Sequence, residues 1–196
     1  MSETFRAFIA VDLPETVRGF LAEIQEALKL HGMPIKWVRP QNIHLTLKFL
    51  GDTNTAKTAR ILTAMTSAAN DCPGVSLTAK DIGVFPDLNR PRVIWAGVNG
   101  QLEVLIKVQR ILDEHLEDLG FPRDRRNFSA HLTLGRVKGK IIADRMKAAI
   151  DGLKGVESEP FEVDRIILFK SELRSTGAIY TPVHQVPCPG HRASPY

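Results

Sequence analysis

The sequence has two cysteines among its 196 residues, and no stretch approaches the about 18 apolar residues that a membrane-spanning helix needs. Cys72 and Cys188 lie far apart, follow no metal-ligand spacing and stand beside prolines in expected loops, which fits a reducing compartment. The first fifteen residues contain Glu3, Arg6 and Asp12, so the uninterrupted apolar run of a signal peptide is absent. We therefore expect a cytoplasmic protein that does not associate with a membrane.

Acidic residues are scarce in two segments, 34–51 and 121–140. The first carries a formal charge of +3 and the second +5, whereas the whole chain carries only +4, so the remainder is negative. The basic residues of the two segments are Lys36, Arg39, Lys48, Arg123, Arg125, Arg126, Arg136, Lys138 and Lys140. Basic side chains gathered at a cleft would attract phosphates, although charge runs also decorate exposed loops.

One tetrapeptide, His-Leu-Thr-Leu, occurs twice, at residues 44–47 and 131–134. In a β-strand alternate side chains share a face, so His44 and Thr46 should lie on one side while Leu45, Leu47 and Phe49 enter the core. The second copy predicts the same division, with His131 and Thr133 on the polar side. Two such strands facing each other would place two imidazoles and two hydroxyls around one cleft.

This set of side chains suits acid–base chemistry on a phosphate. Histidine has an ordinary pKa near ~6.5, so one copy can be neutral and the other protonated at cellular pH. One imidazole can then accept a proton while the other donates one, and a threonine hydroxyl can donate to an oxygen bound beside the ring. The residues alone do not say which histidine is the acid.

Hydrophobic and charged residues make up 43% and 24% of the chain, which is ordinary for a globular protein able to bury a core. Periodicity predicts helices over 14–30, 55–69, 102–119 and 141–153, and strands over 4–11, 35–38, 43–50, 75–82, 92–98, 129–136, 161–173 and 179–186. We expect an α+β fold with two pseudo-symmetric lobes, whose antiparallel sheets flank a central cleft and carry helices on their outer faces. Residues 1–186 would form one bilobal domain and 187–196 a loose tail.

These motifs resemble those of the two-histidine (2H) phosphoesterases, in particular the RNA 2′,3′-cyclic phosphodiesterases, also called 2′-5′ RNA ligases. The resemblance covers nearly the whole chain, through residues 6–11, Pro14 and residues 37–40, 44–51, 83–86 and 131–136. It implies a bilobal fold with pseudo-twofold symmetry. It also implies hydrolysis of an RNA 2′,3′-cyclic phosphate to a 2′-phosphate, without a metal or another cofactor. We expect a monomer that acts on RNA ends or cyclic nucleotides.

The resemblance also assigns roles to matching residues. His44 becomes the proton donor to the leaving 3′ oxygen and His131 the proton acceptor from water. Thr46 and Thr133 would hold the non-bridging oxygens. Arg136 matches the family's phosphate-binding arginine, but strict alternation puts it on the face opposite His131, so this role requires the strand to end or bulge there.

Further RNA contacts are expected outside the motifs. Arg123, Arg125 and Arg126 would steer the RNA backbone by their charge. Phe8 lies on the more polar face of the first strand, where it could line the cleft and stack on the terminal base.

Three alternatives differ from this interpretation. The histidines could be ligands of a metal-dependent phosphodiesterase, although Asp124 is the only acid in either motif segment. The protein could bind RNA ends without catalysis, which needs the basic cleft but not both imidazoles. The biological reaction could also be RNA joining, because the same acid and base could run the reverse of phosphodiester opening.

Overall fold

A computed structural model describes residues 3–124, 127–175 and 177–189 of the chain. The helices are α1 (Glu15–Lys29), α2 (Thr58–Ala69), α3 (Leu102–Glu117) and α4 (Ala143–Asp151), with short 3₁₀ turns at Pro40–Asn42 and Thr55–Lys57. The strands are β1 (Thr4–Val11), β2 (Ile35–Trp37), β3 (Leu45–Asn54), β4 (Val75–Phe85), β5 (Val93–Gly100), β6 (His131–Val137), β7 (Phe161–Val163), β8 (Arg165–Arg174) and β9 (Gly177–Pro187). The predicted order of helices and strands is confirmed except at residues 161–173, where one strand was expected and the structure has two, β7 pairing with β4 and β8 with β1.

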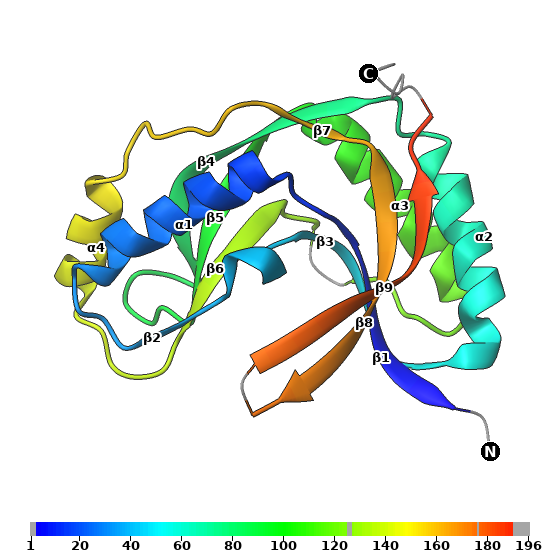
Figure 1. The fold of residues 1–196 in the computed structure, drawn as a ribbon, viewed down its shortest axis with the longest axis horizontal. Coiled ribbons are helices and arrows are strands. Elements are labelled where there is room, and N and C mark those ends of the chain that lie inside the picture. Colours follow the sequence, from blue (N-terminus) through cyan, green and yellow to red (C-terminus); the bar gives the residue numbers. More distant parts are fainter. Residues whose placement is uncertain (1–2, 125–126, 176, 190–196) are drawn as a thin grey trace.

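The strands form one curled antiparallel sheet in the order β7-β4-β5-β6-β3-β1-β8-β9, with β2 added to β6 (Figure 1). Its two halves are the expected lobes. The terminal lobe consists of β1, β3, β8 and β9, and the central lobe of β2, β4, β5, β6 and β7. The lobes join where β3 pairs with β6, with Leu45 opposite Leu132. The two tetrapeptides therefore meet at the junction of the lobes.

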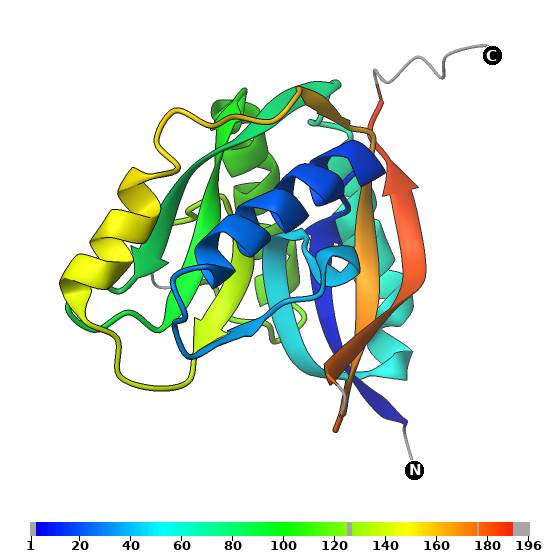
Figure 2. The same cartoon turned by 60° about the vertical axis from the view of Figure 1, so that its left-hand side comes forward.

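The helices lie on the outer faces of the sheet (Figures 1 and 2). Two of them pack on the lobe opposite to the one that contains the preceding strand. Helix α1 follows a strand of the terminal lobe but packs on the central lobe, where Gln25 Nε2 donates a hydrogen bond to the Leu134 carbonyl at 2.8 Å. Helix α3 follows a strand of the central lobe but contacts α2 and β3 of the terminal lobe. This exchange binds the lobes together and supports the expected pseudo-symmetry.

Each tetrapeptide contains a β-bulge at its last leucine. The register of β3 on β1 skips Leu47, and that of β6 on β5 skips Leu134. Such an extra residue reverses the alternation of side chains beyond it. Lys48 is consequently 2% exposed, whereas Phe49 is 66% exposed and lines the cleft. The expectation that Phe49 enters the core was wrong, because it assumed uninterrupted alternation.

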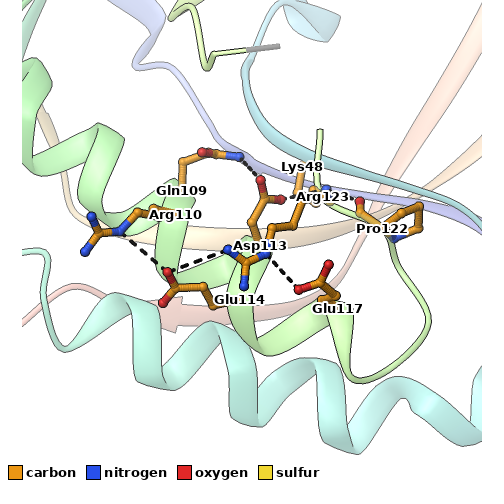
Figure 3. A network of polar contacts seen from close by, with 8 residues as sticks. All are labelled: Lys48, Gln109, Arg110, Asp113, Glu114, Glu117, Pro122 and Arg123. Atoms are coloured by element: carbon orange, nitrogen blue, oxygen red, sulfur yellow. Dashed lines mark hydrogen bonds and ion pairs between the residues drawn. The ribbon is translucent and has the colours of Figure 1, made fainter. Parts of the chain in front are cut away.

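The buried Lys48 belongs to a polar network that joins β3 to α3 (Figure 3). Its Nζ lies 2.6 Å from Asp113 Oδ1 and donates a hydrogen bond to the Pro122 carbonyl at 2.7 Å. The other carboxylate oxygen of Asp113 accepts a hydrogen bond from Gln109 Nε2 at 2.9 Å. The charge of Lys48 is thus neutralised on the far side of the sheet and does not contribute to the basic cleft.

We predict that Lys48→Met lowers the free energy of unfolding by about 3–5 kcal/mol, because it leaves the Asp113 carboxylate buried without its cation. The double variant Lys48→Met/Asp113→Leu should recover most of this loss, since it removes both charges and fills the space with apolar atoms. Urea denaturation measures both values. A Lys48→Met protein as stable as the parent would contradict the structural role of this ion pair.

The last described strand extends beyond the expected domain limit. Pro187 belongs to β9, and Cys188 is 2% exposed. The backbone N–H of Cys188 donates a hydrogen bond to the Asp164 carbonyl at 2.8 Å. These two residues are part of the fold and not of a loose tail. Residues 190–196 of the expected tail lie outside the described residues. Within the described residues, no helix is long and apolar enough to span a membrane.

Candidate active site

A cleft of about 620 Å³ opens between the lobes and receives residues of both tetrapeptides. Its lining includes His44 and Thr46 from the first motif and Thr133 from the second. The basic residues that line it are Arg6, Lys36, Arg39, Arg136 and Lys138, and no described acidic residue joins them. The cleft is therefore suited to an anion.

The two histidines are held in the same way. His44, immediately before β3, has its Nδ1 2.8 Å from the Asn42 carbonyl oxygen, and His131 has its Nδ1 2.7 Å from the Ser129 carbonyl oxygen. A carbonyl oxygen only accepts, so Nδ1 carries the hydrogen in both rings. In each neutral ring Nε2 is then left with a lone pair for proton transfer. Each half of the chain thus supplies one imidazole in the same tautomer.

The surroundings of the two rings differ. The His44 ring stacks on Phe8 with centroids 4.6 Å apart, and Tyr180 meets it edge-on at 5.2 Å. This burial lowers the pKa of His44 below its ordinary value, against the raising effects of the Asn42 carbonyl and the Asp12 charge, and the charge of His131 adds a smaller lowering effect. The ring centroids of His131 and Phe85 lie 5.1 Å apart, with the two rings nearly perpendicular. His131 is not itself among the residues that line the described cleft.

Arg136 lies in the cleft because of the bulge at Leu134. It is two residues beyond the bulge, which returns it to the polar face of β6 that carries Thr133. The condition that its expected role required is therefore met. Phe49 occupies the equivalent position after Leu47 in β3, so the two halves present an arginine and a phenylalanine to the same cleft.

The expected base-stacking role of Phe8 is contradicted by its burial. Phe8 lines the cleft but is only 3% exposed and packs against His44, so it has no open face for a base. Arg123 donates a hydrogen bond to Glu117 Oε2 at 2.8 Å on the helix side of the molecule (Figure 3). Arg125 and Arg126 lie outside the described residues.

Several residues around the histidines were missed or misjudged in the sequence. Phe49 was assigned to the core. Asn42 orients His44 through its carbonyl, while its Nδ2 donates to the Ala178 carbonyl at 2.8 Å. Tyr180 carries no local sequence signal, because its place beside His44 depends on the pairing of β8 with β9 and with β1. Among the described residues, no three His, Cys, Asp or Glu side chains form a group that could hold a metal ion.

The chain is similar in sequence to RNA 2′,3′-cyclic phosphodiesterases of other organisms. RNA 2′,3′-cyclic phosphodiesterase of Methanothermobacter thermautotrophicus is 38% identical over 176 residues, which cover 90% of this chain and 95% of that protein. The protein of the same name from Methanocaldococcus jannaschii is 36% identical over 180 residues, covering 92% and 99% of the two chains.

Solved structures share the fold. A crystal structure of a protein from Thermus thermophilus superposes with a TM-score of 0.78 at 26% identity, covering 95% of this chain and 99% of that one. Escherichia coli LigT complexed with 3′-AMP gives a TM-score of 0.68 at 27% identity, covering 94% and 98% of the two chains. The model of the LigT-like phosphoesterases matches residues 11–95 and residues 97–180, one match in each half. The chain therefore belongs to the LigT-like phosphoesterase family and is a phosphoesterase of the two-histidine kind.

Proposed function

We propose that this protein hydrolyses RNA 2′,3′-cyclic phosphate ends to 2′-phosphates, with His44 as proton donor and His131 as proton acceptor. The observation that carries the proposal is the matched pair of imidazoles, each fixed by a backbone carbonyl beside the junction of the lobes. The basic lining of the cleft supports an anionic substrate. The names of the relatives and the 3′-AMP complex of the Escherichia coli protein favour an RNA end.

In this mechanism Nε2 of His131 takes a proton from water as the water oxygen attacks phosphorus. The bond between phosphorus and the 3′ oxygen breaks, and protonated His44 gives its proton to that oxygen. The products are a 2′-phosphate and a 3′-hydroxyl, with His131 protonated and His44 neutral. Proton exchange with solvent then restores the starting forms.

The remaining polar residues would stabilise charge on the phosphate. The hydroxyls of Thr46 and Thr133 can each donate to a non-bridging oxygen. The guanidinium of Arg136 can bind two oxygens through a planar pair of parallel N–H groups, a geometry that lysine lacks. These interactions would strengthen as negative charge accumulates in the transition state, so they would accelerate the reaction itself and not only substrate binding.

The lowered pKa of His44 is compatible with an acid role once substrate is bound. Burial makes the protonated ring a stronger acid, but it also reduces the protonated fraction in the free protein. A bound phosphate anion acts in the opposite direction, because a nearby negative charge favours the imidazolium. The bound substrate would therefore raise the protonated fraction of His44, which later donates this proton.

Product analysis tests this function. A short RNA ending in a 2′,3′-cyclic phosphate should be converted to the 2′-phosphate form, and the conversion should survive removal of divalent metals by a chelator. A product with a 3′-phosphate would contradict the assigned leaving group. Activity lost with the chelator and restored by one metal would favour metal catalysis, and binding without turnover would favour an RNA-end-binding module. Joining that outpaces hydrolysis with matched RNA ends would favour a ligase.

We predict that Phe49, and not Phe8, stacks on the terminal base. Stacking on an aromatic ring contributes about 1–3 kcal/mol per base, so Phe49→Ala should raise KM for a nucleoside 2′,3′-cyclic phosphate about 5- to 150-fold with little change in kcat. Phe49→Tyr should retain most of the affinity. The matched substrate is ribose 2′,3′-cyclic phosphate without a base, whose KM should not change. An equal loss on both substrates would contradict base stacking.

A further inference from the structure

The segment Gly83-Val84-Phe85-Pro86 contributes to the sequence resemblance but has no role in the mechanism described so far. Phe85 is the last residue of β4, and β4 is separated from β6 in the sheet by β5. The Phe85 ring nevertheless reaches His131, with the ring centroids 5.1 Å apart and the ring planes at 88°. Phe85 therefore packs against the imidazole that would accept the proton from water.

His44 has a neighbour in the same arrangement. The ring of Tyr180 lies with its centroid 5.2 Å from that of His44 and with the ring planes at 89°. Each imidazole is also bonded through Nδ1 to the backbone carbonyl two residues before it. Tyr180 belongs to β9 and Phe85 to β4, so the two aromatic residues come from unrelated parts of the chain. An arrangement that recurs around both imidazoles indicates a requirement of the site and not incidental packing.

A single hydrogen bond does not fix the orientation of an imidazole. The contact of His131 Nδ1 with the Ser129 carbonyl oxygen anchors one atom, and the ring can still tilt about it. The ring of Phe85, nearly perpendicular to the imidazole, restricts this tilt. A tilt would displace Nε2, the nitrogen that exchanges the proton. A displacement of about 1 Å at a reacting group can cost 10²-fold in rate, so the restriction matters for the chemical step.

Trp95 of β5 supports the Phe85 ring. The two ring centroids lie 5.0 Å apart, with the ring planes at 31°. The indole lies over Gly83, its partner in the pairing of β4 with β5, where a β-carbon would come within 2.7 Å of three indole atoms. Among the described residues, none accepts a hydrogen bond from the buried Trp95 Nε1. Packing therefore holds the indole, and glycine at position 83 leaves the space that it needs.

We propose that Phe85 is a positioning residue for His131, and that Trp95, lying over Gly83, keeps the Phe85 ring in place. The proposal rests on the proposed function, in which His131 accepts a proton from water. Phe85 has no proton to give or take, so its contribution is to hold Nε2 of His131 in one direction. Its loss should consequently affect the rate of the chemical step and not the binding of substrate.

Phe85→Leu tests this role, because leucine keeps an apolar side chain but lacks the flat ring. We expect kcat on a 2′,3′-cyclic phosphate to fall about 10- to 100-fold with little change in KM. Phe85→Tyr should recover most of the activity, since it retains the ring. In the His131→Ala background Phe85→Leu should cause no further loss, because no imidazole is left to position. Equal losses in the two backgrounds, or a change in KM alone, would overturn the proposal.

Nitrogen NMR of the histidine rings gives a second result that does not depend on turnover. In the parent, neutral His131 should carry its hydrogen on Nδ1, because the Ser129 carbonyl only accepts. In Phe85→Leu part of the population should change to the Nε2–H form, while His44 keeps its Nδ1–H form as an internal control. An unchanged His131 tautomer would overturn the proposal. A parent protein that hydrolyses no cyclic phosphate would instead contradict the proposed function, and the tautomer would still decide the positioning role.

Gly83→Ala tests the part of Trp95, and it also serves if Phe85→Leu fails to fold. The added methyl group must displace the indole, so kcat should fall about 10-fold with KM little changed. The matched control is Gly19→Ala on α1, where a β-carbon would meet no described atom within 4 Å outside the neighbouring backbone. This control should leave kcat unchanged, and the Tm of both variants shows whether they fold. A folded Gly83→Ala protein with the kcat of the parent would overturn the role of Trp95.

Discussion

Replacing either His44 or His131 by alanine is expected to lower kcat on a 2′,3′-cyclic phosphate by about 10²- to 10⁴-fold, because each variant removes one of the two proton transfers. Binding of a cyclic-phosphate end should remain largely in place, since the basic lining of the cleft is unchanged. Single-turnover rates and equilibrium binding measure the two effects separately. A variant that loses binding and retains kcat would contradict the catalytic assignment of that histidine.

A substrate with a good leaving group separates the two histidines. A 4-nitrophenyl phosphodiester releases a stable anion that needs little protonation, so the His44→Ala enzyme should regain much of its activity on it. His131→Ala should not, because water still needs a base. Recovery by His131→Ala instead would exchange the roles of donor and acceptor.

Arg136→Ala is expected to lower kcat by about 10²- to 10³-fold on long and short substrates alike, because the guanidinium would bind the reacting phosphate itself. Arg136→Lys should recover only part of the loss, since lysine keeps the charge but not the two-pronged geometry. The matched control is Arg110→Ala on α3, whose side chain is 70% exposed and pairs with Glu114 away from the cleft. Equal losses in Arg136→Ala and Arg110→Ala would indicate that Arg136 acts only through the net charge of the protein and not by binding the phosphate.

The repeated tetrapeptide predicted the two strands that meet at the junction of the lobes, because it combines a local strand pattern with chemistry that is visible in single residues. Its leucines fill the core, and Leu45 and Leu132 pair at the junction of the lobes. The helices were also predictable from their apolar stripes, since α3 buries the leucines of one face. These features depend mainly on residues near one another in the chain.

Features decided by distant strands could not be predicted in this way. The bulges at Leu47 and Leu134 depend on how β3 and β6 align with β1 and β5, and no local residue marks them. The bulge at Leu47 reverses the expected faces of Lys48 and Phe49, and the bulge at Leu134 reverses that of Arg136. The resemblance to the two-histidine family did point to the second bulge, because Arg136 would otherwise have faced away from His131.

The measurement that tests the two-histidine mechanism most directly is the pH dependence of kcat and of kcat/KM on a 2′,3′-cyclic phosphate, under conditions where chemistry limits the rate. We predict bell-shaped profiles, because one histidine must be neutral and the other protonated, with apparent pKa values that belong to the pair. Burial lowers the pKa of His44 in the free protein, so the protonated form is lost at a lower pH there than in the phosphate complex. The falling limb of kcat should therefore lie at higher pH than that of kcat/KM. A rate that stays flat from about pH 5 to 9, across the range in which histidine titrates, would contradict the two-histidine mechanism.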